Sequence, residues 1–252
     1  MLALLIPLAV AYSQDDPLSW INGIRRVAGA PAVASDALLS ETAAQWAQRL
    51  AEAGVLSHRA ADGSSALDRY RAVGGTDVHV GEILGAGPRL ADIEQGWMRS
   101  SEHRALALAP AWTHAGWGSS AASRGLAAAS GTPQANASGT PLVVVVLFCE
   151  KLVQELFIKQ GPEGLLVSGS FTPRDAARAL LYSGLDAVEP QSWDAGSRRF
   201  TFQVPGALLA GYLRLGYISP EEKFTLTNAF TLPRGTGSPA VPGRSSVSGA
   251  SP

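Results

Sequence analysis

The chain contains few of the side chains that usually carry chemistry, namely four histidines and one cysteine in 252 residues. The single Cys149 excludes an internal disulfide and a cysteine-based zinc cage. It directly follows the apolar run 143–148, a position typical of a buried strand thiol and not of an activated nucleophile. Nucleophilic chemistry would therefore rest on serine or on a metal held by histidine.

Serine lies close to histidine at two places in the sequence. Ser57 and His58 are adjacent, and neighbours on an extended segment point apart, which is poor geometry for a nucleophile and its base. Ser100 or Ser101 lies near His103, and either serine could form a Ser–His–Glu trio with His103 and Glu82. No G-x-S-x-G elbow exposes a serine, so a serine-type hydrolase is only the alternative interpretation.

Composition narrows the class of protein. The chain has 20 basic and 21 acidic residues, and charged residues make up 16% of it. No basic stripe is present that could neutralise phosphates, so we expect no nucleic-acid partner. Hydrophobic residues make up 46% of the chain, enough to fill the core of one large domain or two smaller ones.

The elements that must position these side chains change in type along the chain. Apolar residues at three- and four-residue steps, with Gly54 as one stop signal, predict helices. The predicted helices span residues 17–28, 36–53 (capped by Ser35 or Asp36), 65–73, 90–99 and 102–108. Two strands, 113–118 and 142–150, follow them and are joined by a long loop rich in Gly, Ala, Ser and Thr. Without regular βαβ alternation, this order favours an α+β layered domain.

The C-terminal part has a different texture. Short apolar segments separated by turn signals predict strands at LFIKQ, GLLVSGSF, RRFTFQV, GYLRLGYIS and FTLTNAF. One short helix is predicted at residues 173–182. We therefore expect a small β-rich domain over residues 151–233, followed by a disordered tail of Gly, Ser and Pro at 234–252.

The first 13 residues resemble a signal peptide, because an apolar run is followed by small residues that suit cleavage. The run has no preceding Lys or Arg, so a buried first helix of the mature protein stays an alternative. It is also too short to span a bilayer comfortably, and we expect no stable transmembrane anchor. The predicted location is secreted, periplasmic or in the cell envelope.

Four short motifs occur in the order found in bacterial CAP (SCP or PR-1-like) domains, and residues 15–150 resemble that superfamily. They are Asn22-x-x-Arg25; Gly54-Val55-Leu56-Ser57-His58; Arg69 and Gly74 leading to Gly81-Glu82-Ile83; and Trp97-Met98-Arg99-Ser100-Ser101-Glu102-His103-Arg104. Ala115-Gly116-Trp117-Gly118 stands in place of the family's G-x-G. The resemblance implies a three-layer α-β-α sandwich with a shallow cleft.

In that superfamily two histidines and two acidic residues line the cleft, and several members bind a divalent cation there. Carried over, the resemblance assigns His58, His103 and Glu82 to the cleft. The second acidic position is Ser100, and the residue after Glu82 is Ile83 instead of the usual Asn. The set is incomplete, which leaves zinc or another divalent cation on His58 and His103, near Glu82, as an open prediction.

The sequence thus predicts a secreted, non-enzymatic CAP-domain module with a lipid, peptide, host or envelope ligand, and no catalytic residues. The alternative is a metal-assisted or serine-type hydrolase that uses the same cleft. Ser100 favours the first interpretation, because it removes a metal ligand and a general acid or base together. We interpret His79 and His114 as incidental, and Trp20, Trp46, Trp97 and Trp117 as core residues.

Overall fold

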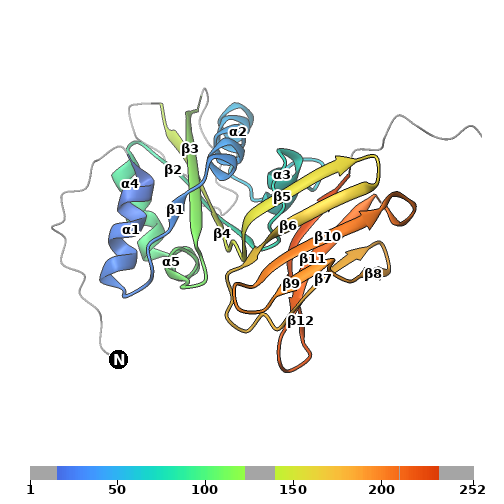
Figure 1. The fold of residues 1–252 in the computed structure, drawn as a ribbon. Coiled ribbons are helices and arrows are strands. Elements are labelled where there is room, and N and C mark those ends of the chain that lie inside the picture. The colour runs from blue at the N-terminus through green and yellow to red at the C-terminus, as the bar shows by residue number, and fades with distance from the viewer. Residues whose placement is uncertain (1–15, 123–139, 210, 233–252) are drawn as a thin grey trace, which may run out of the picture.

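The computed structural model of the chain describes residues 16–122, 140–209 and 211–232. Helices and one sheet form the N-terminal half, and strands form the C-terminal half (Figure 1). The predicted signal segment, the tail at 234–252 and most of the loop between the two predicted strands lie outside the described residues. No helix in the described ranges is long and apolar enough to cross a membrane.

Each of the five predicted helices is present and begins and ends within one residue of its predicted bounds. The helices are α1 (Pro17–Val27), α2 (Ala37–Ala53), α3 (Ala66–Ala72), α4 (Leu90–Arg99) and α5 (Ser101–Leu108). Asp36 caps α2, where its carboxylate accepts a hydrogen bond from the backbone N–H of Leu39 at 2.8 Å. Gly54 ends α2 in the left-handed conformation, with φ of 69°.

The sheet between these helices has the strand order β1-β3-β4-β2. Its strands are β1 (Ala34–Ser35), β2 (Val80–Gly87), β3 (His114–Ala121) and β4 (Leu142–Cys149). β4 is antiparallel to both of its neighbours, and β2 forms one edge of the sheet. The prediction of β3 and β4 is confirmed. β2, which carries Glu82, was not predicted as a strand.

The position of β4 inside the sheet explains why its sequence is apolar at every position. Val143, Val145 and Leu147 pack in one cluster with residues of α2 and α3, whereas Val144 and Phe148 pack with α1, α4 and α5 on the other face. A strand buried on both faces must be apolar throughout. Helices therefore cover both faces of the sheet (Figure 1), and the expected three-layer α-β-α sandwich is confirmed.

Glycine at two positions of β3 lets α2 lie directly on the sheet. A Cβ atom at Gly118 would lie 2.2 Å from the Cα atom of Ala44, and one at Gly116 would lie 2.2 Å from the backbone nitrogen of Ser40. Any larger residue would push the helix away. The Gly116-x-Gly118 motif is thus a packing requirement.

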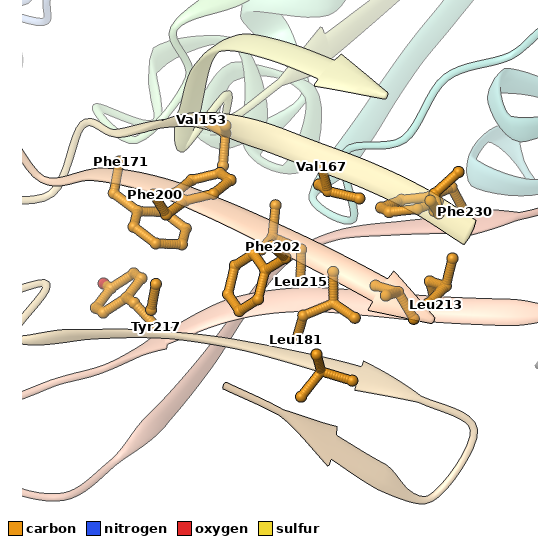
Figure 2. Packing of buried hydrophobic residues seen from close by; sticks show 14 of the residues in the cluster. Val153, Val167, Phe171, Leu181, Phe200, Phe202, Leu213, Leu215, Tyr217 and Phe230 are labelled. Carbon is orange, nitrogen blue, oxygen red and sulfur yellow. The ribbon is translucent and has the colours of Figure 1, made fainter. Parts of the chain in front are cut away.

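The C-terminal half consists of two four-stranded sheets packed face to face. One sheet has the order β5-β6-β10-β9 and the other β12-β11-β7-β8. The strands are β5 (Val153–Gly161), β6 (Gly164–Phe171), β7 (Arg178–Ser183), β8 (Asp186–Val188), β9 (Ser192–Asp194), β10 (Arg199–Pro205), β11 (Tyr212–Ile218) and β12 (Phe224–Thr231). Apolar side chains of both sheets meet between them (Figure 2), with the rings of Phe171 and Phe200 4.7 Å apart.

The predicted helix at residues 173–182 is wrong. The chain turns after Pro173 and then forms β7, which pairs with β11 on one side and β8 on the other. The segment is rich in Ala and Leu, which favour helices. Leu181 is fully buried in the core between the sheets, so tertiary packing overrides this local preference. β8 and β9 were also not predicted.

The two halves are joined through the segment that precedes β2. The backbone N–H of Ala229 in β12 donates to the carbonyl of Thr76 at 2.7 Å, and Val78 donates to the carbonyl of Thr227 at 3.3 Å. The last strand of the β-sandwich (residues 153–232) therefore contacts the helical half directly. That residues 15–150 and 151–233 are separate domains stays a prediction.

Candidate functional site

The residues assigned to the cleft lie around the edge strand β2. Glu82 pairs with Leu147 of β4, so its side chain leaves the sheet on the face covered by α2 and α3. α3 contacts β2, and so does α5, which packs in the cluster on the opposite face of the sheet. His58 comes from the loop after α2, and His103 from α5.

Glu82 is a buried carboxylate with both oxygens engaged. Its Oε1 lies 2.8 Å from Nδ1 of His58, and its Oε2 accepts a hydrogen bond from Nη2 of Arg69 at 2.5 Å. Because an ionised carboxylate only accepts, Nδ1 of His58 carries the proton in this contact. His58 is otherwise exposed, and in the neutral ring its Nε2 keeps the lone pair.

Arg69 holds this arrangement in place. Its guanidinium lies over the ring of Trp46, 3.9 Å from the ring centroid, and Nη1 donates to the backbone carbonyl of His58 at 3.2 Å. The indole N–H of Trp46 donates to the carbonyl of Ser57, which fixes the same loop. Arg69 is buried, and the sequence predicted it only as part of a family motif and not as a site residue. Its place in the motif order, between His58 and Glu82, was the available signal.

Ser100, at the second acidic position, is the N-cap residue of α5. Its hydroxyl oxygen accepts a hydrogen bond from the backbone N–H of His103 at 3.4 Å, at the start of α5. His103 is half-buried. Burial lowers its pKa, the positive charge of protonated His58 lowers it further, and Glu102 acts in the opposite direction. The structure thus brings His58 and Glu82 into contact, and His103 lies close enough to His58 to feel its charge.

The first motif, Asn22-x-x-Arg25, is structural. Arg25 is completely buried and donates to four backbone carbonyls, those of Pro31, Ala107, Ala109 and Trp112. The amide of Asn22 makes two hydrogen bonds with the backbone of Val33. Together these residues fix the chain before β1 and after α5.

The tryptophan of the last motif is also structural, as expected. Trp97 is buried, and its indole N–H donates to the carbonyl of Leu84 in β2 at 3.0 Å. A Cβ atom at Gly85 would lie only 2.9 Å from that indole nitrogen. This packing positions α4 and, directly after it, Ser100 at the start of α5.

Outside the cleft, His79 forms a pair that resembles His58–Glu82. Its Nδ1 lies 2.8 Å from Oε2 of Glu150. Both members of this pair are more exposed than Glu82. His79 therefore offers a matched control for experiments on His58.

The donor set of the cleft does not fit a resident divalent cation. A catalytic zinc site has three protein ligands, and here Glu82 is already bonded to Arg69 and His58. Within the described ranges, no three His, Cys, Asp or Glu residues form a group that could hold a metal ion. The two remaining imidazoles alone do not complete a site.

Comparisons with known proteins found similar solved structures and one matching family. Similar solved structures include an outer surface protein of Borrelia burgdorferi (19% identity, TM-score 0.44) and an extracellular SCP-domain protein of Bacillus anthracis (19%, 0.42). A cysteine-rich secretory protein of Staphylococcus aureus is a third (14%, 0.36). Each alignment covers 53% of this chain, but 88%, 39% and 36% of the respective relatives. No match was found among curated proteins. The profile of the CAP family, described as the cysteine-rich secretory protein family, matches residues 18–146, and the chain belongs to this family.

Proposed function

We propose that the protein is an exported CAP-family binding module whose cleft holds a ligand without transforming it. The observation that carries this proposal is the complete engagement of Glu82 by Arg69 and His58. Both carboxylate oxygens are held by other side chains, and the side chain of Glu82 is only 4% exposed, so a substrate has little access to it. Glu82 therefore positions His58 and does not serve as a general base.

The neighbouring groups support the same conclusion. Ser100 occupies the position of the second acid, and its oxygen is used to cap α5. General acid–base catalysis needs a group that exchanges protons near neutral pH. In the cleft only the imidazoles of His58 and His103 remain for that task, and both can instead serve as hydrogen-bonding groups for a ligand.

Export is part of the proposal. It rests on the apolar N-terminal segment with small residues near its end, and on membership of a family of secretory proteins. The expected location is outside the cell, in the periplasm or in the cell envelope. Mass spectrometry of the exported protein should find a terminus after the apolar segment, and an intact Met1 would contradict the signal-peptide interpretation.

A lipid, a peptide or another envelope molecule is the expected ligand of the cleft. NMR of the imidazole C–H groups can test this with a membrane lipid extract and with a peptide mixture. Binding should shift the resonances of His58 and His103 together and leave those of His79 unchanged. Equal shifts at all three rings, or none, would contradict a ligand site in this cleft.

One observation favours the alternative of a hydrolase. The contact between Glu82 and His58 fixes the imidazole tautomer, as the acid of a catalytic triad does. Ester and peptide substrates should be assayed with the full chain and with the His58→Ala/His103→Ala variant. Our proposal expects both proteins to show the same background rate of hydrolysis. Turnover by the unmodified chain that is absent in the variant would establish the hydrolase.

A further inference from the structure

The end of the β-sandwich that faces away from α1 and α4 exposes large apolar side chains (Figure 1). Leu185 is 93% exposed, Leu208 is 41% exposed and Tyr212 is 40% exposed. They are three of the six large hydrophobic residues that are exposed in the described part of the chain. Single exposed apolar residues are common on soluble proteins, whereas a group of them indicates an interaction surface. We refer to these three side chains as the apolar tip.

Hydrogen bonds hold the segments of the apolar tip together. Leu185 lies in the two-residue turn between β7 and β8, and Leu208 ends the short helical turn that precedes β11. The backbone N–H of Gly184 donates to the carbonyl of Tyr212 at 3.2 Å, and the hydroxyl of Ser183 donates to the carbonyl of Leu208. The three apolar side chains therefore come from neighbouring segments of one surface.

Packing does not explain the leucine at position 185. Gly184, with φ of 62°, supplies the conformation that the turn needs, and its neighbour in such a turn is usually polar. The side chain of Leu185 is almost entirely in water, so it stabilises no core. Residues 205–208 (Pro-Gly-Ala-Leu) are also all exposed and contain no polar side chain. Apolar residues in two adjoining exposed turns indicate a role in binding.

The backbone at the tip suits contact with hydrocarbon. Besides the two bonds above, the N–H of Leu209 donates to the carbonyl of Gly206 at 3.2 Å, and Arg214 donates to the carbonyl of Gly184 at 2.9 Å. Hydrocarbon offers no hydrogen bonds, so backbone groups that are paired within the protein enter a bilayer at lower cost. Tyr212 adds an apolar ring with a polar hydroxyl, which is typical of the boundary between hydrocarbon and water.

Charge and size narrow the occupant further. The charged side chains in the turns at this end are acidic: Asp186 follows Leu185, and Glu163 lies in the turn between β5 and β6. These residues form no basic patch that would attract anionic lipids, so apolar burial must supply the attraction. A stable protein partner needs about 800 Å² on each side, more than three side chains at this exposure supply. A neutral lipid surface fits best.

We propose that the apolar tip inserts into a neutral lipid bilayer and holds the protein reversibly at a membrane surface. Leu185 and Leu208 enter the apolar layer, and Tyr212 lies at its boundary. A single acyl chain gives only weak, reversible anchoring, and this tip buries a similar or smaller apolar area. We therefore expect binding at millimolar lipid. The tip belongs to the sandwich and not to the cleft, so the proposal is independent of the ligand proposed for the cleft.

Flotation of the full chain with phosphatidylcholine vesicles tests the proposal. The unmodified protein should float, and replacing part of the lipid with anionic phosphatidylglycerol should not strengthen binding. Leu185→Ser/Leu208→Ser should weaken the partition by about tenfold or more, because two leucine side chains lose their burial. Phe157→Ser is the matched control, since Phe157 is 51% exposed in the same sandwich but lies on β5, and it should change the partition less than about twofold.

NMR of the unmodified protein gives a local readout that does not depend on a variant. Phosphatidylcholine vesicles that contain a spin-labelled lipid should broaden the methyl resonances of Leu185 and Leu208. Those of Val55, which is 42% exposed but lies in the helical half, should broaden much less. This comparison also separates the tip from any contribution of the apolar N-terminal segment, which is present in every variant. Equal broadening at all three residues would overturn the proposal.

Other outcomes would overturn it as well. They are no flotation of the unmodified protein, stronger binding to anionic vesicles, and equal losses in Leu185→Ser/Leu208→Ser and Phe157→Ser. A dimer that forms through the tip without vesicle binding would identify a second copy as the occupant. The His58→Ala/His103→Ala variant should float as the unmodified protein does. Its failure to float would place the lipid in the cleft and not at the tip.

Discussion

The two halves of the molecule are built on different interiors. All four charged residues that are buried in the described part of the chain belong to the helical half, namely Arg25, Arg69, Asp77 and Glu82. The β-sandwich buries only neutral polar residues beside its apolar core, namely Ser183, Ser219, Thr227 and Asn228. Figure 2 shows that core, which consists of aromatic and aliphatic side chains from both sheets.

This difference teaches where structure and function are coupled. A buried charge is costly unless it is paired, so each one in the helical half fixes its neighbours in one geometry. Arg69 and Glu82 fix the loop of His58 in this way. The apolar core of the sandwich stabilises its fold without such a constraint, and a core of this kind tolerates apolar substitutions that keep its total volume and pattern.

The largest expected effect comes from Arg69→Ala. This change leaves Glu82 buried without its guanidinium and should reduce the free energy of unfolding by about 3–5 kcal/mol. Urea denaturation measures it. A second change, Glu82→Gln, removes the stranded charge and should recover part of the loss. If the double variant is as unstable as the sum of both single variants, the ion pair is not the unit that we describe.

A core truncation in the sandwich should cost somewhat less and should behave differently. Leu215 is fully buried between the sheets, and Leu215→Ala should reduce the free energy of unfolding by about 2–4 kcal/mol. The histidine resonances of the folded protein should stay unchanged, because no charge is stranded. Leu185→Ala, at a side chain that is 93% exposed, is the control and should have no measurable effect.

The sequence predicted the helical half well, because its signals are local. Apolar periodicity gave five helices, Asp36 and Gly54 marked the ends of α2, and the run at 143–148 gave β4. β2 was not predicted as a strand because glycines interrupt its apolar residues. The glycines are there because α4 and α5 lie too close to β2 for side chains. β7 was mistaken for a helix because its strand conformation depends on pairing with β11, far along the chain.

The candidate site was predicted only through the family resemblance. The contact between His58 and Glu82 joins residues from a loop and an edge strand, which no local pattern links. Arg69 was missed as a partner because burial of an arginine depends on the tertiary fold. The same holds for Asp77 and Asn228, which meet across the two halves of the chain.

A smaller effect should come from Glu94, a partly buried carboxyl group on α4. Burial raises its pKa from 4.5 to about 7. The folded state therefore binds the Glu94 proton more tightly than the unfolded state does. The stability that the bound proton contributes is complete below pH 4.5 and is lost as the pH rises through 7. Glu94→Gln should stabilise the protein by about 1–2 kcal/mol at pH 8 and have little effect at pH 4. Thermal melts at both pH values measure this, and equal shifts would contradict it.

The smallest effect should come from the ion pair between Lys151 and Asp36. Both side chains are partly accessible to water, so Lys151→Met should cost about 1 kcal/mol or less at pH 7. Burial acts to raise the pKa of Asp36, but the hydrogen bond from Lys151 and other contacts lower it below 3.8. The difference in the free energy of unfolding between Lys151→Met and the unmodified protein should therefore persist at pH 5 and disappear as Asp36 is protonated in acid. A difference that vanishes already at pH 5 would contradict this assignment.

The central claim is that Glu82 is bonded to Arg69 and His58 and that the cleft is therefore not a metal centre. Zinc titration by calorimetry on the full chain tests this claim most directly. The His58→Ala/His103→Ala variant and the matched control His79→Ala accompany it. We predict no binding at micromolar affinity in any of the three proteins. Micromolar binding that survives in His79→Ala and disappears in His58→Ala/His103→Ala would contradict the account and reopen metal-assisted hydrolysis.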